Sequence, residues 1–137
     1  MNKLAKQAVM EFNQLTNTPI KFNVENNQDL LRLIYSNGGS DHANIVFHED
    51  SGHGWLQVPH SYIDKLGIKK DISNYSYRDT ENAYLEEDCD LSVFMRAIGL
   101  GHEDKEPESK TNLRQNFWEI CPIVTTDYSP IRNKKHY

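Results

Sequence analysis

The chain has 137 residues and carries 20 acidic against 15 basic side chains, a formal net charge of −5 at neutral pH. This length suits a single domain, and seven Tyr, five Phe and two Trp supply enough large apolar surface for a core. The acidic excess argues against a general nucleic-acid binder, which presents a basic face. The same excess is too small for a protein that mimics the phosphates of DNA.

Cysteine content and hydropathy favour a cytoplasmic protein. Cys89 and Cys121 form no CxxC pair and no dense framework of the kind found in secreted domains, so we expect reduced thiols, with one disulfide as the alternative. The sequence contains no run of about 18 apolar residues and no cleavage signal. We therefore expect neither membrane insertion nor export.

Hydrophobic periodicity predicts a mixture of short helices and strands. The predicted elements are helix 3–16, strand 19–24, helix 26–37, strands 44–48 and 55–58, helix 61–67, strands 72–77 and 83–87, and helix 90–98. Ser61 and Asp64 are spaced as a capping box for the third helix, and Gly67 is its stop. This order favours a single α+β domain with a mostly antiparallel sheet and three to four short helices.

Composition divides the chain into three parts. Residues 1–102 hold the predicted α+β core. Residues 103–112 are charged and contain Pro107, which is expected to break any helix, so they are predicted to be an exposed loop or linker. Residues 113–137 begin with an apolar run that should dock on the core as a helical turn or an edge strand, and they end in a basic tail predicted to be mobile.

The loop between the predicted strands 44–48 and 55–58 lies in the segment FHEDSGHGW, which is rich in histidine and carboxylate. Imidazole and carboxylate groups are ligands of transition metals, and an imidazole can also act as a general acid or base. However, glycines beside a histidine are typical of a tight turn, and no zinc spacing such as HExxH is present. We favour a polar hairpin tip, and the alternatives are acid–base catalysis by His53 or a metal site using His42, His48 and His53.

The segment YLEEDCD gathers carboxylates at the predicted junction between a strand and a helix. On a strand, Glu86 and Asp88 would point to one face with Cα atoms roughly 6.6 Å apart, close enough to hold a cation or to shift each other's pKa. Asp88 and Asp90 also lie where a helix begins, so capping is the favoured interpretation. The same carboxylates disfavour a thiolate at Cys89, for which we predict a structural role.

Tyr75 and Tyr77 alternate with serines in the segment NYSY. On a strand they would share one face, where tyrosines most often form cross-strand packing pairs. The alternative is a site that stacks an aromatic ligand or a nucleotide base. The negative charge of the chain makes single-stranded nucleic acid a poor candidate for that ligand.

Three of these motifs together resemble small proteins of phages and other mobile elements. They are HGWLQVP, ISNYSY and YLEEDCD, and the resemblance covers residues 41–98. It implies an accessory protein acting in the cytoplasm of a host cell, one that counters a bacterial defence system by binding and blocking a host protein. Proteins of this kind act by binding, so the resemblance does not imply that the protein catalyses a reaction.

The leading hypothesis is therefore a binding protein that inhibits or modulates a host defence factor through an acidic, aromatic surface. The residues assigned to that surface are Glu49, Asp50, His53, Trp55, Tyr75, Tyr77, Glu86, Glu87 and Asp88. We expect a host protein partner and no cofactor, and homo-oligomerisation is left open. The first alternative is a small metal-dependent or acid–base hydrolase that uses the histidines His42, His48 and His53 with the carboxylates Glu86 and Asp88. The second alternative is a protein that sequesters a nucleotide signal. The distance from His53 to Glu86 or Asp88 decides between the two interpretations of the loop. A short distance favours a metal or acid–base site, and a long one favours a polar hairpin tip.

Overall fold

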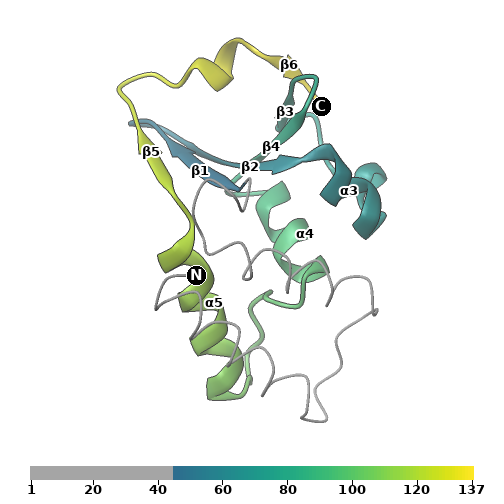
Figure 1. The fold of residues 1–137 in the computed structure, drawn as a ribbon, viewed down its shortest axis with the longest axis vertical. Coiled ribbons are helices and arrows are strands. Elements are labelled where there is room, and N and C mark those ends of the chain that lie inside the picture. Colours follow the sequence, from purple (N-terminus) through teal and green to yellow (C-terminus); the bar gives the residue numbers. More distant parts are fainter. Residues whose placement is uncertain (1–44) are drawn as a thin grey trace.

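The structure is a computed structural model that describes residues 45–137 of the chain (Figure 1). The helices predicted at 3–16 and 26–37, the strand predicted at 19–24 and His42 lie outside the described residues. The described part contains three α-helices, two short 3-10 helices and six strands. In chain order they are β1 (Val46–Glu49), β2 (Gly54–Pro59), α3 (His60–Leu66), η2 (Lys69–Asp71), β3 (Tyr77–Arg78), β4 (Asn82–Glu86), α4 (Asp90–Ala97), α5 (Glu108–Ile120), β5 (Ile123–Thr125), η3 (Pro130–Asn133) and β6 (Lys135–His136).

The six strands form one sheet in the order β5-β1-β2-β4-β3-β6. Neighbouring strands are antiparallel, except that β1 and β5 run parallel. The predicted hairpin is confirmed as β1 and β2, with His48 opposite Trp55. The turn before β4 also forms as predicted, because Asp79 accepts hydrogen bonds from the backbone N–H groups of Glu81 and Asn82. The structure thus confirms a single α+β domain with a mostly antiparallel sheet.

One face of the sheet forms the main core, and we call it the core face. Since side chains alternate along a strand, Leu56 and Val58 of β2 share this face with Ala83 and Leu85 of β4, and all four are fully buried. The three described α-helices supply the opposing apolar side chains, among them Tyr62, Ile63, Phe94, Met95, Leu113, Phe117 and Ile120. Burial of this apolar surface supplies most of the driving force for folding.

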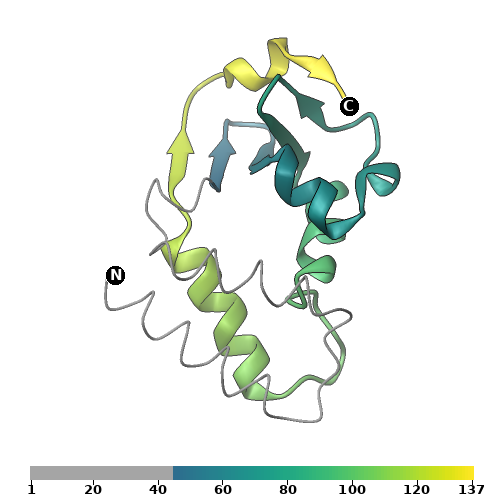
Figure 2. The same ribbon diagram turned by 45° about the vertical axis from the view of Figure 1, so that its right-hand side comes forward.

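The opposite face, which we call the outer face, is covered by the C-terminal segment, residues 126–137. The chain leaves β5 at one edge of the sheet, crosses the outer face through η3 and ends as β6 at the other edge (Figure 2). Ile131 packs on Trp55 and Tyr84 with Tyr77 beside them, which makes a second, smaller apolar cluster. The sheet is therefore covered on both faces, by α-helices on the core face and by the C-terminal segment on the outer face.

Two ion pairs attach the C-terminal segment to the sheet. Arg132 donates through Nε and Nη2 to the two carboxylate oxygens of Asp50, at 2.6 and 2.8 Å. Lys134 Nζ lies 3.1 Å from a carboxylate oxygen of Asp79. The segment predicted to be a mobile basic tail thus lies on the sheet, because its basic side chains meet carboxylates that are distant in sequence.

The serine-rich segment before β3 is a loop and not the predicted strand. Residues 72–76 turn because Ser73 and Ser76 donate through their hydroxyl groups to the buried carboxylate of Asp90. Such side-chain bonds compete with the pairing of a strand. The same contacts correct the role predicted for Asp90, because α4 begins after Cys89 without a hydrogen bond from a capping side chain.

Two helices begin elsewhere than predicted. α3 begins at His60, directly after Pro59, so the capping box of Ser61 and Asp64 does not form. α5 begins directly after Pro107, where the missing N–H of proline costs nothing because the first turn of a helix has free N–H groups. The predicted charged loop is correspondingly shorter, and the apolar run that follows it supplies both the end of α5 and the edge strand β5.

Both cysteines are free thiols, as predicted. Burial raises the pKa of Cys121 to about 11. None of the helices that the structure describes is long and apolar enough to cross a membrane.

Candidate functional site

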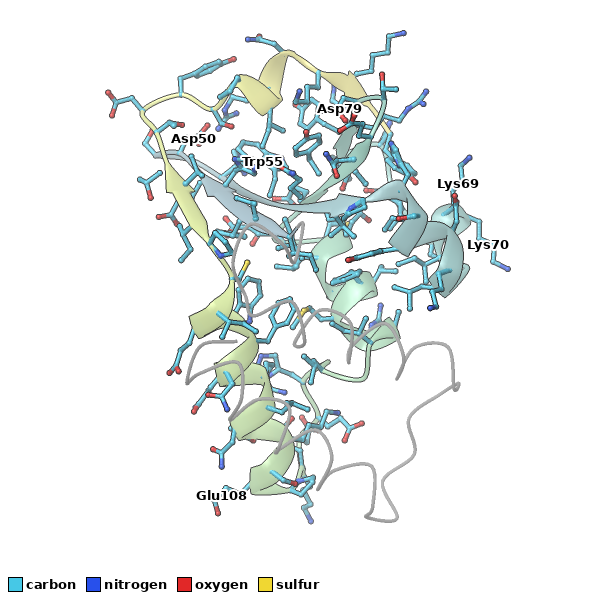
Figure 3. The ribbon with its side chains drawn as sticks, viewed as in Figure 1. Asp50, Trp55, Lys69, Lys70, Asp79 and Glu108 are labelled. Carbon is cyan, nitrogen blue, oxygen red and sulfur yellow. The ribbon has the colours of Figure 1, made fainter. Side chains whose placement is uncertain are left out.

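The outer face contains an open pocket of about 420 Å³ beside the C-terminal segment. Figure 3 shows Trp55 and Asp50 between the sheet and that segment. Six of the nine residues predicted to form a binding surface line this pocket, namely His53, Trp55, Tyr75, Tyr77, Glu86 and Asp88. They come from the β1–β2 loop, β2, the loop before β3, β3 itself and the end of β4, so the fold brings together motifs that are separate in sequence.

The hairpin tip presents His53 at the edge of the pocket. Asp50 Oδ1 accepts hydrogen bonds from the backbone N–H groups of Gly52 and His53, each at 3.0 Å, and Asp50 N donates to the carbonyl of His53 at 2.9 Å. These bonds close a tight turn, as the glycines predicted. The His53 side chain remains 49% exposed, so its ring is accessible to a ligand.

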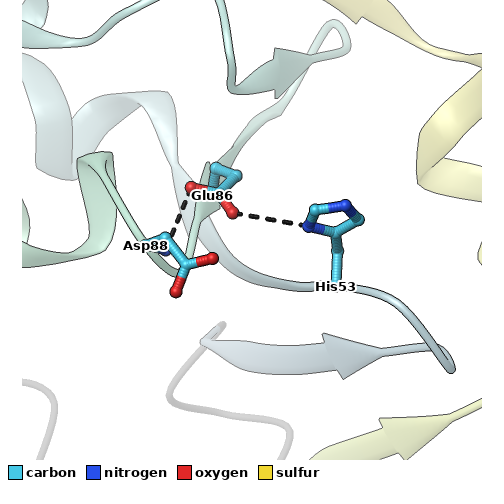
Figure 4. Close-up of side chains that lie close together, drawn as sticks. All are labelled: His53, Glu86 and Asp88. Carbon is cyan, nitrogen blue, oxygen red and sulfur yellow. Dashed lines mark hydrogen bonds and ion pairs between the residues drawn. The ribbon is translucent and has the colours of Figure 1, made fainter.

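Glu86 ends β4 directly opposite Trp55 of β2, which places it beneath the hairpin tip. Its Oε1 lies 3.7 Å from His53 Nδ1, and its Oε2 accepts a hydrogen bond from the backbone N–H of Asp88 at 2.9 Å (Figure 4). One potential ligand atom from each of these three side chains lies within 4.8 Å of the other two. Asp88 follows β4 in a turn, and it joins Glu86 through this turn and not through the alternation of a strand.

The environment of Glu86 favours its protonated form more than usual. Burial raises the pKa of the Glu86 carboxyl above its ordinary value, and the negative charge of Asp88 acts in the same direction. The hydrogen bond from Asp88 N and the proximity of His53 oppose this shift. A carboxyl poised in this way can exchange a proton with the neighbouring imidazole, or it can be neutralised by a bound cation.

Aromatic side chains form the wall of the pocket. Tyr77 packs edge-on against Trp55 with ring centroids 6.2 Å apart, and His136 lies across Tyr77 at 4.5 Å. The Arg132 guanidinium carbon lies 5.1 Å from the centre of the Trp55 ring. Tyr75 stands apart from these pairs at the rim, where 69% of its surface is exposed. Tyr75 and Tyr77 therefore share a pocket but not a strand.

A buried hydrogen-bond network sets the position of the Tyr75 loop. Asp90 accepts from the backbone N–H and the hydroxyl of Ser73 and from the hydroxyl of Ser76. Ser76 Oγ in turn accepts from the backbone N–H of Glu86 at 3.0 Å. The network therefore connects the loop that carries Tyr75 to the strand end that carries Glu86.

Comparison with known proteins identifies no relative of the chain. No family model matches it, and neither the curated proteins nor the solved structures contain a match. Function has to be inferred from the residues of the pocket.

Four candidates from the sequence do not line the pocket. Asp50 is bound by Arg132, and Glu49 accepts a hydrogen bond from Thr125 at 2.9 Å. His48 Nε2 is 2.8 Å from Gln57 Oε1 on the neighbouring strand. A separate groove beside α4 contains Glu87 among its lining residues. Asp50, Glu49 and His48 thus support the hairpin and its neighbouring strands, and none of the four side chains lines the pocket with His53.

Three residues of the pocket were not assigned to a binding site from the sequence. Arg132 and His136 reach it from the C-terminal segment, and His136 Nδ1 donates to the carbonyl of Asn74 at 2.7 Å. Cys89 lines the pocket while its thiol contacts Ser73 and Asp90. The only signal in the sequence for the first two was a basic, aromatic tail, which is common in chain ends without a docking site.

Proposed function

We propose that the protein is a small binding protein that engages a protein partner through the pocket of the outer face. The observation that supports this proposal is the exposure of Tyr75 at the rim of a pocket walled by Tyr77 and Trp55. Tyrosine and tryptophan supply large contact area with few rotatable bonds, and they are enriched among the residues that dominate binding energy at interfaces. A hydrogen-bonded loop holds this tyrosine, which lowers the entropy lost on binding.

The charge of the same surface suits a partner with basic side chains around an apolar contact. Glu86 and Asp88 lie at one end of the pocket, and the chain as a whole carries a net charge of −5. Complementary charge accelerates encounter and selects the orientation of the complex. The resemblance of residues 41–98 to phage and mobile-element proteins makes a host defence factor the proposed partner, which the protein would block by binding.

The test compares two tyrosines of similar exposure. Tagged wild-type protein is used to isolate a stoichiometric partner from host lysate, and affinity for the purified partner is then measured by calorimetry. We expect Tyr75→Ala to weaken binding at least ten-fold, the effect of losing an interface residue worth about 1.4 kcal/mol. The control is Tyr128→Ala, because Tyr128 is 62% exposed but does not line the pocket. Equal affinity of the two variants, or the absence of any partner, contradicts the proposal.

A second candidate function is acid–base hydrolysis at the same pocket. It is favoured by one observation, the 3.7 Å distance between His53 Nδ1 and Glu86 Oε1. An imidazole and a carboxyl with a raised pKa can divide the roles of base and acid. Purified protein would be assayed on ester, phosphoester and peptide substrates. Activity that His53→Ala removes and His102→Ala retains supports this candidate, and a lack of activity on all three classes rejects it.

A further inference from the structure

The side chains of His53, Glu86 and Asp88 can close around a single ion. Their ligand atoms lie within 4.8 Å of one another. Atoms bound to one Zn²⁺ at about 2.0–2.2 Å are themselves roughly 3–3.5 Å apart, so the group needs to contract by only about 1–2 Å. His53 and Asp88 are exposed enough to make that movement by rotating about their side-chain bonds.

Glu86 is the least mobile of the three side chains. Its side chain is only 13% exposed, and the backbone N–H of Asp88 holds Oε2 in place. Its other oxygen faces His53 Nδ1 at 3.7 Å, which is too long for a hydrogen bond. With its proton on Nε2, the His53 ring would direct the lone pair of Nδ1 towards Glu86 Oε1, and a cation between the two atoms would be bound by both.

A second unusual group belongs to a residue that lines the same pocket. Trp55 lines the pocket and is 2% exposed, and its indole Nε1 has no hydrogen-bond partner among the residues that the structure describes. Buried N–H groups without an acceptor are rare because they lose their hydration without compensation. The acceptor that this donor lacks is an oxygen atom, which a metal-bound water or a ligand would supply if it entered beside the indole.

We propose that His53, Glu86 and Asp88 bind a divalent transition-metal ion, with Zn²⁺ as the probe, whose open coordination positions face the pocket. An imidazole is a common ligand of zinc, whereas Ca²⁺ and Mg²⁺ sites are built from oxygen ligands. Three protein ligands leave at least one position for water or for a donor atom of the partner. This inference rests on the proposed function only where it assigns the pocket to a partner. The binding of the ion itself does not depend on the proposed function.

The experiment is a calorimetric titration of Zn²⁺ into the full chain after removal of metals with a chelator. Absorption spectra with Co²⁺ report the coordination of the ion. We expect one ion per chain and at least a ten-fold loss of affinity in His53→Ala, Glu86→Gln and Asp88→Asn. The matched controls are His102→Ala, Glu81→Gln and Asp71→Asn, which change the same residue types outside the pocket and should bind as the wild type does.

Three outcomes overturn the proposal: no saturable binding, binding that survives all three pocket variants, or equal losses in the controls. Asp88→Asn guards against a trivial loss by misfolding, because Asp88 is exposed and its own side chain supports no described contact in the core. The measurement needs only the purified protein. A failure of metal binding therefore leaves the Tyr75 test of partner binding unaffected, and the reverse also holds.

Discussion

The core face and the outer face of the sheet are closed by different forces. On the core face, apolar side chains such as Leu56 and Leu85 pack against three helices over the width of the central strands. On the outer face, a single segment covers Trp55 and Tyr84, and it is attached by the Asp50–Arg132 and Asp79–Lys134 ion pairs. The first cover depends on non-directional burial, whereas the second depends on a few directional contacts.

This difference explains where the pocket lies. Helices that pack by burial spread over a whole apolar face, because every additional buried group contributes. The C-terminal segment is a single stretch of chain held by the two ion pairs, by Ile131 and by the pairing of β6 with β3, and it leaves part of the outer face uncovered. The pocket opens beyond that cover, where Trp55 is buried beneath Arg132 while Tyr75 remains at the exposed rim. The pocket thus lies on the face with the less extensive cover.

The largest expected effect comes from the core face. Leu56→Ala should lower the free energy of unfolding by about 3 kcal/mol, because it removes a fully buried side chain and leaves a cavity. Ile131→Ala, on the outer face, should cost less in global stability, since the C-terminal segment can detach without unfolding the core. Urea denaturation measures both. Equal losses of unfolding free energy in the two variants would show that the two faces unfold as one unit, which would contradict the difference between them.

A smaller effect is expected from the glycine that begins β2. A Cβ at Gly54 would lie 2.4 Å from Cζ of Phe47 and 2.9 Å from Oε2 of Glu87, so Gly54→Ala should cost about 2 kcal/mol through overpacking. Gly67→Ala is the control, because that position has open space and only a positive φ of 68° to oppose it, at about 1 kcal/mol. Thermal unfolding of the two variants checks the order, and the reverse order would mean that the hairpin has room to adjust.

The smallest effect on global stability is expected from a fall in pH, which should act locally on the outer face. The hydrogen bonds from Arg132, together with backbone N–H groups, hold the pKa of Asp50 well below its usual range. The stabilisation is therefore complete above the pKa of an unfolded Asp, near 3.9, and is lost as the pH falls from there towards the lowered value. Docking of the segment that carries Arg132 should weaken over that range.

Fluorescence of Trp55 in a Trp118→Phe background reports this docking, since Arg132 lies over the Trp55 ring. Asp50→Asn should show at pH 7 the spectrum that the parent protein reaches only in acid. A spectrum that is unchanged in both cases would mean that the ion pair does not hold the segment.

Several elements could be predicted from the sequence because their causes are local. The β1–β2 hairpin follows from alternation on both sides of a glycine-rich turn, and α4 follows from apolar residues at helical spacing. The stop at Gly67 follows from its left-handed backbone. The loop at residues 72–76 could not be predicted, because Ser73 and Ser76 leave the strand pattern only in the presence of the buried Asp90.

The candidate site also has a part that could be predicted from the sequence and a part that could not. The residue types that could carry chemistry, His53, Glu86 and Asp88, are evident in the sequence, as is the tight turn that presents the imidazole. Their convergence depends on the pairing of β2 with β4, which puts Trp55 opposite Glu86. The aromatic wall depends on Arg132, which meets Asp50 across 82 residues of chain. Periodicity and turn preferences act over a few residues, so they determine the elements, whereas the burial of two sheet faces decides which distant side chains share a pocket.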